Sequence, residues 1–403
     1  MKKLAIDGGK KVISKALTPV PWPPLYPETK EKLAEVYMRG HWSFYGPEEI
    51  RFNEEFAKFT GAANCIAMAN GTVTLQCAME ALGIGPGDEV LVPAFTWLAT
   101  GTSVVDTGAV PVVVDIELDT WCMDVAAAEA AITPRTRAII PVHLFGSMAN
   151  MDKIMALAHK YNLKVIEDCA HSHGGCWDGK HTGTIGNAGS FSFQESKALA
   201  SGEGGACITN DDNLAETIGR LSHIGYPFGA KQGKKYTPPP MGLVCHNFRF
   251  TDFQAAILLG QLAHLEEDTI AREKAAEYLR AELEKIPGVK FQARGAKATR
   301  QSYYMFGFYI DPSMLKPGIK RKEVAAALKE EGLPLGNGWG QPMYRQNLWS
   351  VPPSKYRIES CAVAEDLIYN RMFTTGLAWL NRPKKELDLF VEAVRKVMTA
   401  YLA

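Results

Sequence analysis

The chain has 403 residues, 46% of them hydrophobic and 22% charged, a length that predicts a globular enzyme of two domains rather than one small core. Its 44 lysines and arginines balance 44 aspartates and glutamates, which excludes the basic composition of proteins that bind nucleic acid or anionic membranes non-specifically. No apolar run reaches membrane-spanning length and residues 1–15 lack a signal-peptide pattern, so we expect a cytoplasmic protein that does not enter the membrane.

The first two thirds of the chain predict alternating strands and helices. Residues 1–27 are proline-rich and predict an extended arm, followed by helices from residue 28 and after Gly46. The strands that follow are short, β-branched and apolar without alternation, which is typical of strands buried on both faces. Such a pattern predicts βαβ units and a mostly parallel sheet flanked by helices. The predicted strands are 65–69, 89–92, 110–115, 137–142 and 164–167, and the predicted helices are 72–82, 96–106, one near Asp124, and 151–161.

The last part of the chain predicts a second, smaller domain. Strands are expected at 190–193 and 206–209, and a long surface loop at 225–242, which is rich in Gly, Lys and Pro. One continuous helix is predicted from 252 to about 285, leading into the second domain. That domain is expected to hold a strand at 303–310, a helix from 321, an irregular segment at 334–353 and a closing helix from 386. The predicted division is an arm (1–27), a large domain (28–265) and a small domain (266–403).

Four groups of polar or aromatic residues fall at the ends of predicted strands, where open α/β sheets bind ligands. The first is Asn70-Gly71-Thr72, at a strand-to-helix turn. Glycine permits close backbone approach and a helix N-terminus offers unpaired N–H groups, so this turn predicts either a phosphate site or a plain helix cap. The second contains Trp97, whose side chain suits stacking on a planar ring, although a lone tryptophan is equally typical of a core.

The third group begins with Asp168, at the end of an apolar strand, where a carboxylate is costly without a partner. A protonated pyridine nitrogen of pyridoxal 5′-phosphate (PLP) would be such a partner, and the alternative is a helix cap. A zinc site is a further alternative, because thiols and imidazoles follow closely. The spacing of these groups matches no common structural zinc site, and we expect no metal and only free thiols. The residues of the zinc alternative are Cys169, His171, His173 and Cys176.

Lys197, in the fourth group, follows a buried strand and precedes the glycine-rich turn Gly202-Glu-Gly-Gly205. Schiff-base chemistry needs a lysine amine that is neutral part of the time, which a desolvated or positively charged setting favours. The alternative is an ordinary surface lysine.

These four groups, in this order, resemble the sugar aminotransferases of the DegT/StrS type, within the fold-type I PLP enzymes. The resemblance covers nearly the whole chain and is strongest over 70–209. Its most specific segments are Ser190-Phe-Ser-Phe-Gln-x-Ser-Lys197 and Asn247-Phe-Arg-x-Thr-Asp-x-Gln-Ala-Ala256. It implies an α/β fold with a mostly parallel, seven-stranded type of sheet flanked by helices in the large domain, plus a smaller α+β C-terminal domain.

The resemblance also implies PLP as the cofactor and a homodimer with shared active sites. Lys197 would bind the cofactor covalently and later move a proton, and Asp168 would bind the pyridine nitrogen. The remaining implied roles are stacking on the ring for Trp97, a place near the ring hydroxyl for His171, phosphate binding for Gly71, Thr72 and Ser192, and contact with the neighbouring subunit's cofactor for Asn247.

Three details resemble a narrower branch, the L-glutamine:scyllo-inosose aminotransferases and the related 3-amino-5-hydroxybenzoate synthases. They are Pro21-Trp-Pro23, Glu167-Asp-Cys-Ala-His-x-His-Gly174 and the Phe-Ser-Phe-Gln before Lys197. We therefore expect transfer of an amino group from an amino acid, L-glutamine, to a ketone on a cyclitol or sugar, as in aminocyclitol, aminosugar and antibiotic biosynthesis. The segment Ala198-Leu-Ala-Ser201 departs from the usual pattern after the lysine.

Four alternatives remain open from the sequence. Two lie within the family: an activity like that of the 3-amino-5-hydroxybenzoate synthases, and amination of a nucleotide-linked sugar. A deoxysugar dehydratase is the third, although related dehydratases carry histidine where this chain has Lys197. The fourth is a catalytically inactive regulatory protein of the same fold, which an intact Asp168 and Lys197 disfavour.

Overall fold

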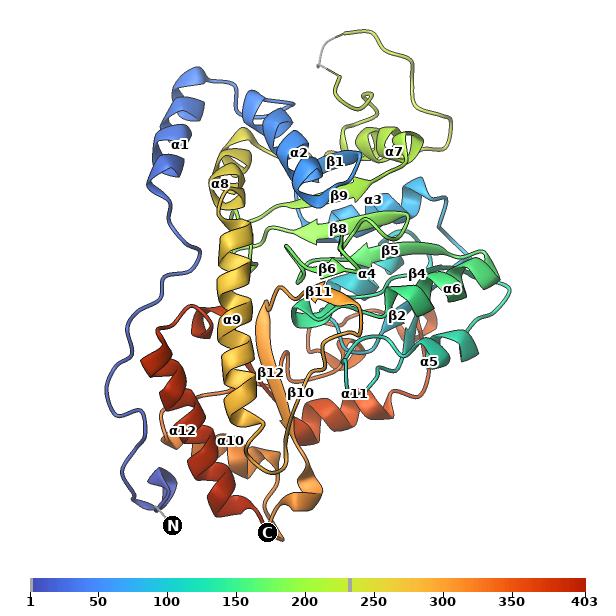
Figure 1. The fold of residues 1–403 in the computed structure, drawn as a ribbon. Coiled ribbons are helices and arrows are strands. Elements are labelled where there is room, and N and C mark those ends of the chain that lie inside the picture. Colours follow the sequence, from blue (N-terminus) through green and yellow to red (C-terminus); the bar gives the residue numbers. More distant parts are fainter. Residues whose placement is uncertain (1–2, 231–233) are drawn as a thin grey trace.

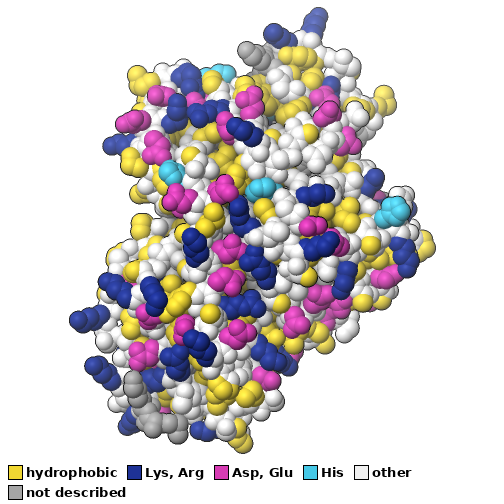
Figure 2. Space-filling view, viewed as in Figure 1, with side chains coloured by type: hydrophobic (Ala, Val, Ile, Leu, Met, Phe, Trp, Pro, Cys, Tyr) yellow, Lys and Arg dark blue, Asp and Glu magenta, His cyan; other side chains and the backbone are white. Residues whose placement is uncertain are grey.

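The computed structural model describes residues 3–230 and 234–403. The first two residues of the expected arm, and residues 231–233 of the predicted 225–242 loop, lie outside the described residues. In Figure 1 the N- and C-terminal ends lie close together, and the arm runs along one side of the molecule to a helix at the opposite end. Figure 2 shows Lys and Arg side chains interspersed with Asp and Glu over the same face, as the balanced charge predicts.

An eight-stranded sheet forms the centre of the larger part, in the order β1-β9-β8-β5-β4-β2-β3-β13. Neighbouring strands from β8 to β13 are parallel, and β9 and β1 are antiparallel to their neighbours. This confirms the predicted parallel-rich α/β sheet. The strands are β1 (Asn64–Met68), β2 (Glu89–Pro93), β3 (Val110–Val114), β4 (Thr136–Ile139), β5 (Lys164–Asp168), β8 (Ala188–Ser192), β9 (Gly205–Thr209) and β13 (Arg357–Ile358).

The edge strand β13 adds an eighth strand to the seven-stranded type of sheet implied by the resemblance. It comes from the C-terminal part of the chain and pairs in parallel with β3. The guanidinium of Arg357, the first residue of β13, donates to the buried Glu89 carboxylate on β2 at 3.2 Å, which ties this distant segment to the sheet.

Helices cover both faces of the sheet, and two of the predicted helices differ most from the structure. The single helix predicted from 252 to 285 is wrong: it is two helices, because the chain turns at His264, whose ring stacks on Tyr26 at 4.1 Å and hydrogen-bonds Glu28 at 3.0 Å. The helix predicted from residue 96 begins three residues later. The helices are α1 (Pro27–Arg39), α2 (Pro47–Thr60), α3 (Gly71–Ala81), α4 (Ala99–Asp106), α5 (Val125–Ala130), α6 (Met151–Tyr161), α7 (Asp212–Ser222), α8 (Asp252–Leu262), α9 (Leu265–Leu283), α10 (Arg321–Glu330), α11 (Ala362–Asp366) and α12 (Lys384–Tyr401).

A second, smaller hydrophobic core lies at the other end of the long helix α9 (Figure 1). It packs α9, α10 and α12 against an antiparallel sheet of β10 (Val289–Phe291), β12 (Met305–Ile310) and β14 (Met372–Gly376). A further small sheet consists of β6 (Cys176–Trp177), β7 (Lys180–His181) and β11 (Ala298–Arg300). All eight cysteines are free. Among the described residues, no helix is both long and apolar enough to span a bilayer. The division at residues 27 and 265 stays a prediction.

Glu331, just after α10, anchors the start of the arm to the smaller core. Its carboxylate is fully buried and accepts hydrogen bonds from the backbone N–H groups of Ala5 at 2.8 Å and Val12 at 3.0 Å. It also pairs with the Lys396 ammonium on α12 at 2.7 Å. One buried carboxylate thus holds together three segments that are far apart in sequence.

We expect Glu331→Gln to lower the free energy of unfolding by about 3–5 kcal/mol, because it leaves the nearly buried Lys396 charge without its partner. The measurement is urea unfolding of the variant beside the wild type. Glu330→Gln is the matched control, since Glu330 pairs with Lys11 only at the surface, and we expect a change within about 0.5 kcal/mol. Equal effects of the two substitutions would contradict the anchoring role of Glu331.

Candidate active site

A cavity of about 660 Å³ opens at the carboxyl ends of the parallel strands, as expected for an open α/β sheet. The sheet brings the four predicted groups to this one place, although they span more than a hundred residues of sequence. Every predicted site residue except Asn247 lines the cavity: Gly71, Thr72, Trp97, Asp168, His171, Ser192 and Lys197.

Asp168 is the last residue of β5 and lies at the bottom of the cavity, 6% exposed. Its carboxylate accepts a hydrogen bond from the Thr100 hydroxyl at 2.8 Å and one from the Ala170 backbone N–H at 3.1 Å. Burial raises the pKa of Asp168, and these hydrogen bonds offset only part of that effect. No ion pair to Asp168 occurs in the described parts of the chain, so this carboxylate is suited to a cationic group of a ligand.

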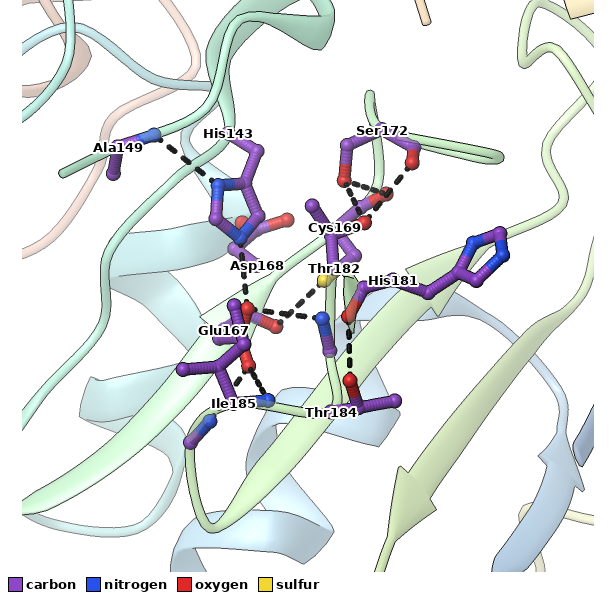
Figure 3. A network of polar contacts seen from close by, with 12 residues as sticks. His143, Ala149, Glu167, Asp168, Cys169, Ser172, His181, Thr182, Thr184 and Ile185 are labelled. Carbon is purple, nitrogen blue, oxygen red and sulfur yellow. Dashed lines mark hydrogen bonds and ion pairs between the residues drawn. The ribbon is translucent and has the colours of Figure 1, made fainter. Parts of the chain in front are cut away.

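The neighbouring residue, Glu167, points to the other side of the strand, and Figure 3 shows its surroundings. Its carboxylate accepts hydrogen bonds from the His143 Nε2–H at 3.0 Å and from three backbone N–H groups, those of Gly183, Ile185 and Gly186. Burial alone would raise the pKa of Glu167, but these donors outweigh it and the pKa lies below its usual range. Because the Ala149 N–H donates to Nδ1 of His143, the imidazole is held as the Nε2–H form. The Glu167 carboxylate therefore already has its hydrogen-bond partners within the protein.

The zinc alternative does not match the arrangement of its residues. Cys169 directs its Sγ to the Glu167 carbonyl at 3.6 Å, and Cys176 lies 3.9 Å from the Gly174 carbonyl. In the part of the chain that the structure describes, the one group of three possible metal ligands is His143, Glu167 and Cys169. The Glu167 carboxylate of this group already accepts the four hydrogen bonds described above. It contains only one of the four residues that the sequence proposed as zinc ligands.

Lys197 lies in the loop between β8 and β9, and its side chain forms part of the cavity wall. Its Nζ lies over the ring of Tyr304, 4.6 Å from the centroid. Burial lowers the pKa of Lys197 to about 8, against the opposing effect of the Asp168 carboxylate. At pH 7 about a tenth of the amine is therefore neutral, far more than for a lysine with an ordinary pKa, and nucleophilic lysine chemistry requires such a neutral fraction. The surface-lysine alternative does not describe this residue.

Gly71 and Ser192 approach each other closely beside the start of α3. A Cβ atom on Gly71 would lie 2.7 Å from the Cβ of Ser192, so no other residue fits there without a shift. Asn70 caps the helix, and its side-chain oxygen accepts from the N–H groups of Thr72 and Val73 at 3.1 and 3.0 Å. The cap alternative is thus correct for Asn70. A phosphate role for Gly71, Thr72 and Ser192 stays a prediction.

Aromatic rings form another part of the cavity wall. Trp97 is 40% exposed and lines the cavity, so the alternative of a core tryptophan is wrong. The His171 ring stacks on Tyr304 at 4.2 Å and lies 5.7 Å from Trp339. Burial lowers the pKa of His171 well below its usual value, which keeps the ring neutral. The Phe145 N–H donates to its Nδ1 at 3.4 Å, which leaves Nε2 as the protonated nitrogen.

Several cavity residues are absent from the predicted site, among them Thr100, Tyr304 and Trp339. Thr100 follows Thr96 by four residues, and their hydroxyls lie 2.8 Å apart at the start of α4. Tyr304 and Trp339 come from the C-terminal part of the chain, and no local pattern marks them. Asn247 is exposed and does not line the cavity of its own chain.

Comparison with known proteins agrees with this geometry. The DegT/DnrJ/EryC1/StrS aminotransferase family matches residues 25–378. An L-glutamine:2-deoxy-scyllo-inosose aminotransferase of Streptoalloteichus tenebrarius is 37% identical and covers 98% of this chain and 97% of its own. A protein of the same name from Micromonospora echinospora is 36% identical, over 90% of this chain and 87% of its own.

Solved structures give the same result for the fold. A crystal structure of 3-amino-5-hydroxybenzoic acid synthase is 31% identical, with a TM-score of 0.86, over 96% of this chain and 100% of that chain. A DegT/DnrJ/EryC1/StrS aminotransferase from Brucella abortus is also 31% identical, with a TM-score of 0.80, over 92% of this chain and 95% of that chain. The predicted fold class and family resemblance are thereby confirmed. The chain belongs to the DegT/DnrJ/EryC1/StrS aminotransferase family.

Proposed function

We propose that this protein binds PLP at the described cavity and transfers an amino group from L-glutamine to a ketone on a cyclitol ring. The observation that carries the proposal is the meeting of Lys197 and Asp168 in one cavity at the carboxyl edge of the sheet. One supplies an amine with a lowered pKa and the other a buried carboxylate without a cationic partner. The relatives' names support glutamine as donor and a keto-cyclitol as acceptor.

The residues present fit PLP. Asp168 suits a protonated ring nitrogen, because a cation there would relieve the cost of burying the carboxylate. The close approach of Gly71 and Ser192 leaves backbone and a hydroxyl facing the space beside the α3 N-terminus, which suits a phosphate. The half-exposed Trp97 offers a flat face for stacking on a ring.

The mechanism follows from the positions of these side chains. When bound, PLP supplies an electron sink for the electron pair left on the amino donor's α-carbon after it loses a proton. The Lys197 Nζ would take that proton and deliver it to the carbon on the other side of the transferred nitrogen, a general acid–base role for which a pKa of about 8 is suited. Asp168 would keep a proton on the ring nitrogen, and the neutral His171 would donate a hydrogen bond from Nε2 to the ring hydroxyl. Water would then release the deaminated donor as a keto acid, and the acceptor ketone would take up the amino group by the same steps in reverse, with loss of water.

A homodimer with shared sites is part of the proposal. Asn247 is exposed and lies outside the cavity of its own chain, so it is free to reach a neighbouring subunit. Under this proposal, Asn247 contacts the cofactor phosphate bound by the partner.

The test is the visible absorption spectrum of the PLP-loaded protein before and after addition of L-glutamine without an acceptor. We expect the absorption band of the lysine-bound cofactor to disappear and the band of the aminated cofactor to appear. The amount of aminated cofactor should equal the amount of enzyme. A spectrum that does not change with L-glutamine but changes with L-glutamate would support an aminotransferase and reject glutamine as the donor. The absence of any cofactor band would reject the proposal.

A second candidate is synthesis of an aromatic amine, favoured by the likeness to 3-amino-5-hydroxybenzoic acid synthase. That reaction would yield an aromatic product with strong ultraviolet absorption from an aminated ring precursor. Product analysis after incubation with a keto-cyclitol separates the two, since simple amination leaves the ring saturated.

A further inference from the structure

We infer that Thr96 and Thr100 form a chain of two hydroxyl groups that aims the Asp168 carboxylate at the ring nitrogen of the cofactor and favours its anionic form. Both threonines are then positioning residues, which act through Asp168 rather than on the substrate. The inference rests on the proposed function and deepens it, because it assigns control of the proton on the cofactor ring to two side chains outside the predicted site. Both threonines line the cavity and are 1% exposed.

The two hydroxyl groups form a chain with a defined direction. The Thr100 hydroxyl donates its one hydrogen to Oδ2 of Asp168 at 2.8 Å. Thr100 Oγ1 also lies 2.8 Å from Thr96 Oγ1, and because the Thr100 hydrogen is already used, the Thr96 hydroxyl must donate this second bond. The chain therefore runs from Thr96 through Thr100 to Asp168. Because hydrogen bonds in a chain polarise one another, Thr96 should strengthen the bond that Thr100 makes.

The other carboxylate oxygen of Asp168 is fixed by the backbone. Its Oδ1 accepts from the Ala170 N–H at 3.1 Å, so each oxygen has one donor and the carboxylate cannot rotate freely. In residues 3–230 and 234–403, no third hydrogen bond to this carboxylate occurs. A carboxylate oxygen can accept about two hydrogen bonds. Because Asp168, Thr100 and Ala170 all line the cavity, the remaining capacity is available to a donor on a ligand.

Backbone hydrogen bonds hold both ends of the chain in place. The Asp168 N–H donates to the Pro141 carbonyl at 2.9 Å, and the Asp168 carbonyl accepts from the His143 N–H at 3.1 Å. At the other end, the Gln346 side chain, from the C-terminal part of the protein, donates to the Thr96 carbonyl at 3.0 Å. Support on both sides keeps the carboxylate oxygens in one position, as the binding of a ring nitrogen requires.

The direction of the chain favours the charged form of Asp168. Burial raises the pKa of this carboxyl, whereas donors to its oxygens stabilise the anion and lower the pKa. Lys197 and His143 are the other ionisable groups that act on it, and both also lower the pKa. Without the Thr100 hydroxyl, the pKa of Asp168 would rise further. The more basic carboxylate would then compete with the ring nitrogen for the proton that the electron sink needs.

A purely structural role for these hydroxyls is the alternative. Thr102, on the same helix, shows that role: its hydroxyl donates to the Ala99 carbonyl of its own helix at 3.4 Å, and it does not line the cavity. The Thr100 hydroxyl instead donates to a carboxylate on β5, 68 positions later in the chain. Thr102→Val is therefore the matched control for Thr100→Val.

The first test is the nitrogen NMR signal of the ring in protein loaded with PLP labelled at the ring nitrogen. We expect Thr100→Val to shift this signal towards that of an unprotonated pyridine, and to weaken PLP affinity about tenfold, since hydrogen bonds to charged groups are the strong ones. Thr100→Ser, which keeps a hydroxyl, should restore the wild-type signal. Thr96→Val should shift the signal in the same direction by less, and should add nothing in the Thr100→Val background, where the chain is already broken.

The second test is thermal unfolding of the cofactor-free protein from about pH 4 to neutral pH. The wild type loses stability as pH rises, until the pH passes the raised pKa of Asp168. Thr100→Val should continue to lose stability up to a higher pH, so its difference from the wild type should grow with pH. A purely structural role predicts the same difference at every pH, and that result would overturn the inference. Thr102→Val should show no growing difference.

These measurements separate failure of the inference from failure of the proposed function. If the wild type binds no PLP, the proposed function is wrong and the inference falls with it. If the wild type binds PLP and reacts with L-glutamine, but Thr100→Val leaves the ring-nitrogen signal unchanged, the inference alone is wrong. If Thr100→Val does not fold, Thr96→Val takes its place, and an unchanged signal in that variant would reject the chain.

Discussion

Lys197→Ala is expected to reduce the rate of amino transfer by about 10³-fold or more. Under the proposed function, the variant loses both the amine that binds the cofactor and the group that moves the proton, and proton transfer by a positioned side chain alone contributes about 10²–10⁴-fold. Steady-state turnover with L-glutamine and a keto-cyclitol measures the loss. Borohydride reduction of the loaded wild type, followed by peptide mass mapping, should place the cofactor on Lys197.

Lys180→Ala is the matched control, because Lys180 is exposed on β7 and does not line the cavity. It should keep full turnover, and no cofactor should be found on it after reduction. Normal turnover of Lys197→Ala, or reduced cofactor on any other lysine, would contradict the assignment.

The parts of the site that lie at strand ends could be predicted from the sequence. A run of buried β-branched strands predicts a parallel sheet, and a parallel sheet brings its carboxyl ends to one edge. Asp168 ends β5 and Gly71 opens the helix after β1, so their meeting follows from the topology. A carboxylate at the end of a buried strand and a glycine at the start of a helix each suggest a ligand site, and the family resemblance then implied one cofactor for both.

The parts supplied by distant segments could not be predicted. Trp339 reaches the cavity because Thr374 and Phe95 hold its segment, and those contacts join positions with no common local pattern. The break between α8 and α9 is of the same kind. No glycine or proline marks it, and the stacking of His264 on Tyr26 is a tertiary contact. Edge strand β13 has only two residues, too few for any periodicity to be read.

Asp168→Asn should have opposite effects on catalysis and on the stability of the cofactor-free protein. Under the proposed function, the variant with cofactor bound loses the anionic partner of the ring nitrogen. Breaking a buried ion pair costs about 3–5 kcal/mol, which corresponds to a loss of about 10²–10⁴-fold in rate if the pair acts in the transition state. Steady-state turnover of the loaded variant measures this loss. The Thr100 hydroxyl, which now donates to Asp168, can still bond the amide, so the local structure should persist.

Without the cofactor, the same substitution should stabilise the fold at neutral pH. Burial raises the pKa of Asp168 above its unfolded value of about 3.9, so the folded protein binds the proton more tightly than the unfolded chain does. The wild type therefore loses stability as pH rises from about 4 through the raised pKa, whereas the amide of the variant does not ionise and contributes no such loss. Thermal unfolding of both cofactor-free proteins across this pH range should show the curves together at low pH and the variant above the wild type at neutral pH. A variant that is less stable than the wild type at neutral pH would mean that the Asp168 carboxylate has a cationic partner within the protein, and that it is not kept for the cofactor.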